Sequence, residues 1–167
     1  MNDVPTTVWC KEPMLTRVVS LQAWQSDPEA SVFLSAETLE ELIVQAQLVD
    51  ESRALWVECL VDWKGCQIID IETTLEIGRW LIAQDRSFVL SAPLEPSALC
   101  LLDNLGVKQV CIRKNATVPD SFLYTQLAWC LNRFDYTIGI DDRGLSEDDR
   151  SELMQNGWIA QRVGVVR

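Results

Sequence analysis

The fold is decided by residues 54–91, which read ALWVECLVDWKGCQIIDIETTLEIGRWLIAQDRSFVLS. The run Ala54–Val61 is rich in apolar, β-branched and aromatic residues, which is typical of a strand buried on both faces. Residues Ile71–Gln84 then place apolar side chains at helical spacing, and Ser87–Ser91 forms a second apolar run. This order predicts two parallel strands joined by a right-handed crossover through a helix.

The same alternation continues on both sides of this unit. Further strands are expected at Ser31–Leu34, Val107–Arg113, Tyr136–Asp141 and Trp158–Val166. Further helices are expected at about Ala36–Glu51, from Pro96 to Gly106, from Pro119-Asp120 to Phe134, and from a cap at Ser146 to Gly157. The sequence therefore predicts a three-layer α/β fold, in which a mostly parallel sheet carries helices on both faces.

The length of 167 residues suits a single domain with one sizeable core. Residues 1–30 contain several prolines and no clear period, so they are expected to form an N-terminal arm or an edge element. Residues 31–167 are expected to form the single α/β domain.

The composition excludes several classes of function. The chain has no histidine, which removes catalytic triads and histidine-bearing zinc sites. Its net charge of −11 argues against nucleic acid and anionic membranes as partners, because both are bound through Lys and Arg. The absence of a long apolar stretch and of a basic, apolar leader predicts a cytoplasmic protein. The six cysteines form no C-x-x-C pair and are expected to be mainly structural thiols.

Acidic residues follow several of the expected strands. Asp62, Asp141 and Asp142, with Asp70 as a further ligand, are candidates for a divalent metal site at the carboxyl ends of the strands. Helix caps and solvated loops have the same appearance, and they are the more common explanation for acids in these positions.

The segment between Val61 and Ile71 occupies the place of a phosphate-binding loop. Such a loop needs several glycines, then a lysine and a Ser or Thr, but only Lys64 and Gly65 are present. No cofactor is therefore expected. Trp63 lies in the same segment between polar neighbours, where it is a candidate contact residue for a partner.

From Ala54 onward the order of elements resembles the RecA-type ATPase core without its phosphate-binding loop. The sequences DRSFVLSAP (85–93), NLGVKQV (104–110), DYTIGI (135–140), LSEDDRSEL (145–153) and GVVR (164–167) resemble SulA, the family of SOS-response inhibitors of bacterial cell division. The resemblance covers residues 54–167. It implies a non-catalytic protein that binds FtsZ and blocks its polymerisation, as a homodimer.

The resemblance also implies contact residues, which match Arg86, Leu90 and Lys108 in this sequence. Arg86→Glu is expected to weaken partner binding more than folding. Two alternatives stay open. One is a RecA-like scaffold without ATPase activity in recombination or mutagenic repair, and the other is a metal-dependent hydrolase that uses Asp62 and Asp141.

Overall fold

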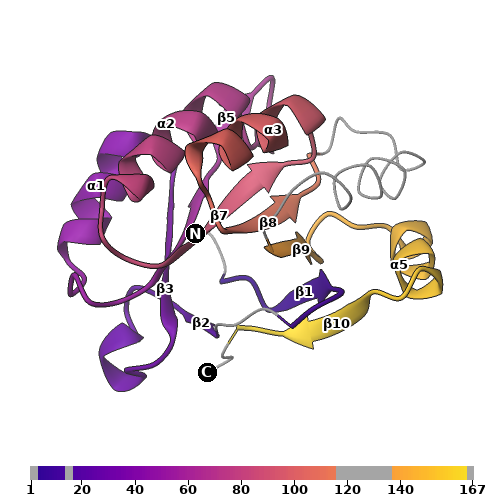
Figure 1. Cartoon of the computed structure of the whole chain (residues 1–167), viewed down its shortest axis with the longest axis horizontal. Coiled ribbons are helices and arrows are strands. Elements are labelled where there is room, and N and C mark those ends of the chain that lie inside the picture. Colours follow the sequence, from indigo (N-terminus) through magenta and orange to yellow (C-terminus); the bar gives the residue numbers. More distant parts are fainter. Residues whose placement is uncertain (1–3, 14–16, 116–136, 165–167) are drawn as a thin grey trace.

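The computed structural model describes residues 4–13, 17–115 and 137–164, and these form one eight-stranded sheet, a small hairpin and several helices (Figure 1). The strands are β1 (Thr7–Cys10), β2 (Val18–Val19), β3 (Ser31–Ala36), β4 (Leu55–Cys59), β5 (Val61–Trp63), β6 (Cys66–Ile68), β7 (Phe88–Pro93), β8 (Gln109–Arg113), β9 (Thr137–Asp141) and β10 (Ile159–Arg162). The helices are the 3-10 helix η1 (Trp24–Ser26), α1 (Leu39–Gln47), α2 (Ile71–Ile82), α3 (Pro96–Leu105) and α5 (Glu147–Gln155). The large sheet has the order β10-β1-β9-β8-β7-β4-β3-β2.

The parallel part of the sheet follows the chain in order. From β3 through β4, β7 and β8 to β9, each strand lies beside the one before it and runs parallel to it. Right-handed crossovers that always step in one direction place their helices on one face. Helices α1, α2 and α3 lie together on that face, as Figure 1 shows. The predicted mixed α/β fold with a mostly parallel sheet is therefore confirmed.

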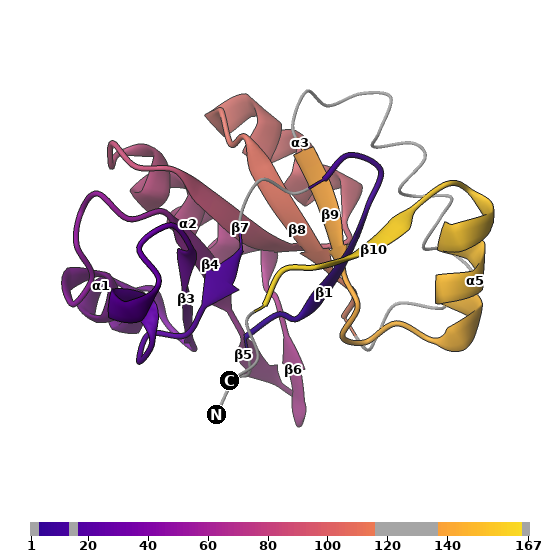
Figure 2. The same cartoon turned by 90° about the horizontal axis from the view of Figure 1, so that it is seen from below.

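The predicted helices on the second face are not seen in the described part of the chain. The helix expected to end at Phe134 falls in residues 116–136, outside the described residues. Instead, the sheet curls (Figure 2): Val18 of β2 forms a parallel bridge with Gly164, just beyond β10, so the two outermost strands meet at one point (Figure 1). A Cβ on Gly164 would collide with the backbone of Pro5, so this approach requires glycine.

The N-terminal residues take part in this closure. β2 is an edge strand, whereas β1 lies inside the sheet and runs antiparallel to both β9 and β10. Strict alternation of strands and helices predicts that each strand runs parallel to its neighbours. β1 departs from this prediction because it comes before the strand–helix–strand units in the chain and is connected to neither β9 nor β10 by a crossover helix.

Two apolar cores lie on the two faces of the sheet. The helix-covered core joins strand residues such as Leu34 and Leu90 to Leu42, Leu81 and Leu102 of the helices. The core inside the curl contains alternate residues of the same strands, namely Val8, Cys10, Val18, Phe33, Trp56, Val89, Cys111 and Val163. Alternation along each strand thus supplies both cores. Burial, as expected for a structural thiol, raises the pKa of Cys59 to about 11.

The helix ends agree best with the sequence where they carry clear caps. Pro96 begins α3 and Gly106 ends it with φ 89°, both as predicted. Ser146 and Asp149 form the expected capping box of α5. None of the helices in the described ranges is long and apolar enough to cross a membrane.

Candidate functional site

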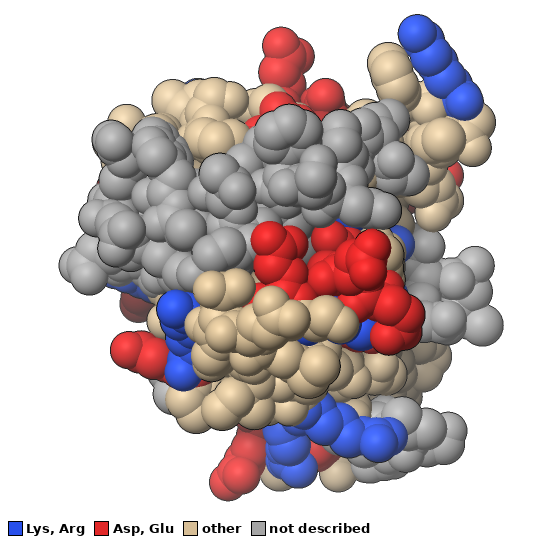
Figure 3. Space-filling view, turned by 90° about the vertical axis from the view of Figure 1, so that its right-hand side faces the viewer, with Lys and Arg blue, Asp and Glu red and all other residues tan. Residues whose placement is uncertain are grey.

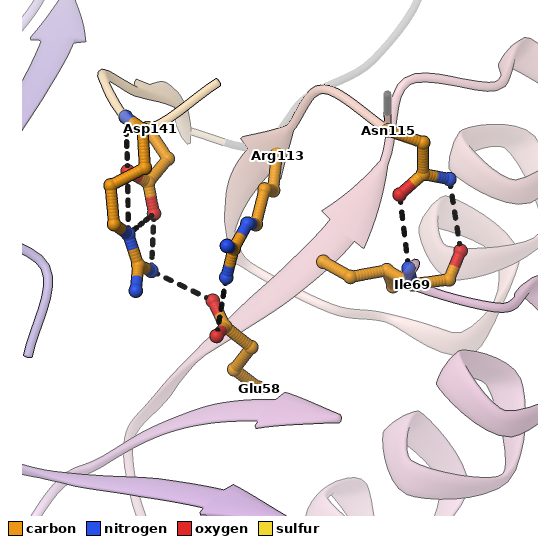
Figure 4. Close-up of polar contacts among 6 residues, drawn as sticks. Glu58, Ile69, Arg113, Asn115 and Asp141 are labelled. Atoms are coloured by element: carbon orange, nitrogen blue, oxygen red, sulfur yellow. Dashed lines mark hydrogen bonds and ion pairs between the residues drawn. The ribbon is translucent and has the colours of Figure 1, made fainter. Parts of the chain in front are cut away.

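Four charged residues meet at the carboxyl ends of the parallel strands, where α/β proteins usually bind ligands (Figure 4). Glu58 lies on β4, Arg113 ends β8, Asp141 ends β9 and Arg143 follows it. The Arg113 Nη1 donates to Glu58 Oε1 over 2.7 Å, and the Arg143 Nη2 donates to Glu58 Oε2 over 2.8 Å. Arg143 also bonds Asp141 through Nε and Nη2. These four residues are called the carboxyl-edge cluster below.

The charges of this cluster balance, two arginines against two carboxylates. Glu58 is 0% exposed, and burial raises its pKa although Arg143 and Arg113 act in the opposite direction. Burial also acts to lower the pKa of Arg143, but its bond to Asp141 and the charge of Glu58 outweigh burial and raise it. Arg143 therefore stays charged, and the ion pairs hold both guanidinium groups in fixed orientations.

A hairpin takes the place of the phosphate-binding loop. β5 and β6 pair antiparallel around Lys64 and Gly65, whose φ angles of 51° and 81° fit a two-residue turn. Trp63 is 47% exposed, and the Lys64 ammonium lies 4.6 Å from the centre of its ring. Trp63 is thus exposed, and its contact with a partner stays a prediction, while the hairpin offers no glycine-rich cradle.

The base of this hairpin is fixed to the sheet by a buried asparagine. The Asn115 side chain accepts a hydrogen bond from the Ile69 N–H over 3.0 Å and donates one to the Ile69 carbonyl over 3.2 Å (Figure 4). The side chain satisfies both backbone groups of Ile69, as a neighbouring strand would. The residues after β8 therefore position the chain that leads into α2.

The four aspartates considered as candidate metal ligands do not come together. Asp62 is exposed in the hairpin, and Asp70 caps α2 by accepting from the Thr73 N–H. Asp142 accepts from Trp9 and Arg150, while Asp141 pairs with Arg143. Within residues 4–13, 17–115 and 137–164, no three His, Cys, Asp or Glu residues are arranged to bind a metal ion. The alternative of a metal site at these residues does not fit their positions, because Asp70 caps a helix, Asp141 and Asp142 form ion pairs, and Asp62 is exposed on the hairpin.

A second ion pair holds α5 against the same edge. Lys114 and Asp149 are both buried, and the Lys114 Nζ lies 2.9 Å from Asp149 Oδ2. Burial acts to raise the pKa of Asp149, but the bonds from Lys114 and from the Ser146 N–H outweigh burial and lower it. Asp149 therefore serves both the helix cap and the ion pair.

The opposite, amino edge of the sheet carries a groove of about 510 Å³. Arg86 and Lys108, two of the predicted contact residues, both line it, together with Asp85 and Phe88. Lys108 is exposed, whereas the Arg86 guanidinium donates to the carbonyls of Asp50 and Glu51. Partial burial lowers the pKa of Arg86. This groove is called the amino-edge groove below.

The other predicted contact residues lie elsewhere. Leu90 is 1% exposed and packs in the helix-covered core, so it is not on a partner-binding surface. The prediction for Leu90 is wrong because β7 is a central strand, with both faces covered. Trp63 lies on the hairpin that follows β4, at the other edge of the sheet from Arg86.

The sequence pattern does not predict the carboxyl-edge cluster. One signal was present, because Glu58 is an acid inside an otherwise apolar strand. A buried acid requires a partner, so its position indicates that a cation lies nearby. Its partners Arg113 and Arg143 are distant in sequence, and nothing in the pattern pairs them with Glu58. Comparisons of the chain with protein-family models, with curated proteins and with solved structures found no match.

Proposed function

We propose that this protein is a non-catalytic inhibitor of bacterial cell division, which binds FtsZ through the amino-edge groove and blocks its polymerisation. One observation carries the proposal: Arg86 and Lys108, which the SulA resemblance assigns to the contact region, line the same groove. As the resemblance implies, the binding form is a homodimer.

The charge distribution favours a local contact of this kind. The protein carries a net charge of −11, and Figure 3 shows acidic side chains gathered on the face that includes α5, whose first turn holds Glu147, Asp148 and Asp149. An acidic partner such as FtsZ would be repelled by this face. The amino-edge groove presents two cations, of which Lys108 is exposed, and it can accept an acidic segment.

The hairpin at the phosphate-loop position supports the non-catalytic part of the proposal, because a protruding pair of strands stands where a nucleotide would need backbone N–H groups. A three-layer, RecA-like arrangement would require helices on the second face of the sheet as well. Binding through the amino-edge groove does not depend on that arrangement.

The test is sedimentation of FtsZ with GTP, with and without an excess of this protein. The expected result is a smaller FtsZ pellet when the protein is present. An undiminished pellet at excess inhibitor would contradict FtsZ as the partner.

Charge reversal at the exposed lysine then tests the groove. Lys108→Glu is expected to restore pelleting and to weaken FtsZ binding by about tenfold or more, since it places like charges at the contact. Arg162→Glu is the matched control, because Arg162 is exposed on β10. Equal inhibition by both variants would remove Lys108 from the interface while leaving FtsZ as the partner.

A further inference from the structure

The carboxyl-edge cluster contains one arginine with donors to spare. Arg113 uses Nη1 for Glu58, while its Nε and Nη2 donate to no residue that the structure describes. Its side chain is 23% exposed, so part of the guanidinium or its stem is in contact with solvent. The Nε–H and Nη2–H groups point in parallel, which is the arrangement that binds both oxygens of a carboxylate.

A buried hydroxyl lies on the same face of the sheet. Ser91 is 2% exposed, and its Oγ forms no hydrogen bond with any residue in the described ranges. Ser91 pairs in register with Cys111, two residues before Arg113 on β8, and Pro93 pairs with Arg113 itself. Because side chains alternate along a strand, Ser91 and Arg113 point to the same side, one layer apart. An unsatisfied buried hydroxyl costs stability, which an incoming acceptor would recover.

From these observations we infer that the carboxyl-edge cluster binds the carboxylate of a small organic acid, with Arg113 as the bidentate donor and Ser91 as a further donor. Glu58 acts as a positioning residue, since it is fully buried and fixes the Arg113 guanidinium. The position agrees with the general rule that ligands of parallel sheets bind beyond the carboxyl ends of the strands.

The surrounding charges favour a singly charged group over a phosphate. Glu58 and Asp141 belong to the cluster, so an incoming anion meets these two carboxylates as well as the two guanidinium groups. The cluster itself is neutral, so binding depends on directed hydrogen bonds rather than on excess positive charge. A doubly charged phosphate would meet more repulsion from these acids than a carboxylate.

The experiment is an NMR titration of the protein with acetate, in which the Arg113 Nε–H signal and the Ser91 amide signal are followed at constant ionic strength. The expected result is a saturable shift of both signals. Inorganic phosphate, titrated in the same way, is expected to bind at least several-fold more weakly. A shift that does not saturate, or phosphate binding as tight as that of acetate, would overturn the proposal.

Two variants separate binding from folding. Arg113→Lys keeps a positive charge beside Glu58 but loses the bidentate edge, so about a tenfold loss of acetate affinity is expected. Ser91→Ala removes the unpaired hydroxyl, so it should weaken acetate binding several-fold without unfolding the protein. Arg150→Lys and Ser97→Ala, both outside the cluster, are the controls. Unchanged affinity in Arg113→Lys would contradict the proposal, and none of these readouts involves FtsZ.

Discussion

The two edges of the parallel sheet hold their arginines in different ways. At the carboxyl edge, Arg113 and Arg143 share the buried Glu58, and the second pair joins residues 85 positions apart. At the amino edge, Arg86 donates only to backbone carbonyls of a neighbouring loop, and Lys108 is exposed. The arginines at the carboxyl edge therefore hold strands together, while at the amino edge Arg86 holds a loop and Lys108 is available for other contacts.

Removing a cation from the carboxyl edge should cause the largest loss of stability. Arg143→Met leaves Glu58 and Asp141 with less compensation in a buried site, and a loss of about 3–5 kcal/mol in the free energy of unfolding is expected. Urea denaturation measures this loss. Arg150→Met, which removes two partly exposed pairs, should cost about 1 kcal/mol or less. Equal losses in the two variants would show that the carboxyl-edge cluster stabilises the fold no more than a partly exposed ion pair does.

Asn115 offers an intermediate test of the same edge. Asn115→Ala leaves the buried N–H and carbonyl of Ile69 without their partners, so unfolding should become easier by about 2–3 kcal/mol. Hydrogen exchange at the Ile69 amide should also accelerate. Asn104→Ala, at an exposed position of α3, is the control and should change stability by less than about 0.5 kcal/mol. Unchanged protection of Ile69 would argue against this role of Asn115.

The smallest effects are expected at the amino edge. Arg86→Met loses its bonds to Asp50 and Glu51, at a cost of about 1 kcal/mol, and Lys108→Met should stay within about 0.5 kcal/mol of the wild type. Thermal or urea unfolding compares the two. Because Arg86 makes these bonds, Arg86→Glu is now expected to lower stability as well as to weaken partner binding. A larger loss of unfolding free energy for Lys108→Met than for Arg86→Met would contradict the view that Arg86 is the structural cation of this edge.

Local signals in the sequence predicted the elements better than the sheet. Pro96, Gly106, Ser146 and Asp149 act within one or two turns of helix, and they mark the observed helix ends closely. The hairpin was missed, although Lys64-Gly65 between short alternating segments is compatible with a two-residue turn. Its location after a strand had suggested the remnant of a phosphate loop.

The site depended on pairings that local patterns do not contain. Two of the predicted contact residues share a groove because β7 and β8 are neighbours, which alternation of strands and helices suggests. The partners of Glu58 come from the ends of β8 and β9, which lie two and three places from β4 in the sheet, and no local pattern specifies these pairings. Burial of Leu90 likewise follows from the central place of β7 in the sheet.

The place of β1 between β9 and β10 affects how the molecule folds. Cys10 and Ile159 are paired although they lie 149 residues apart, so the chain must close a very long loop before this contact can form. Contacts of such high sequence separation slow folding, whereas the adjacent strand–helix–strand units can form early. During synthesis β1 exists well before its two partners, and its unpaired edge is then open to aggregation or to chaperones.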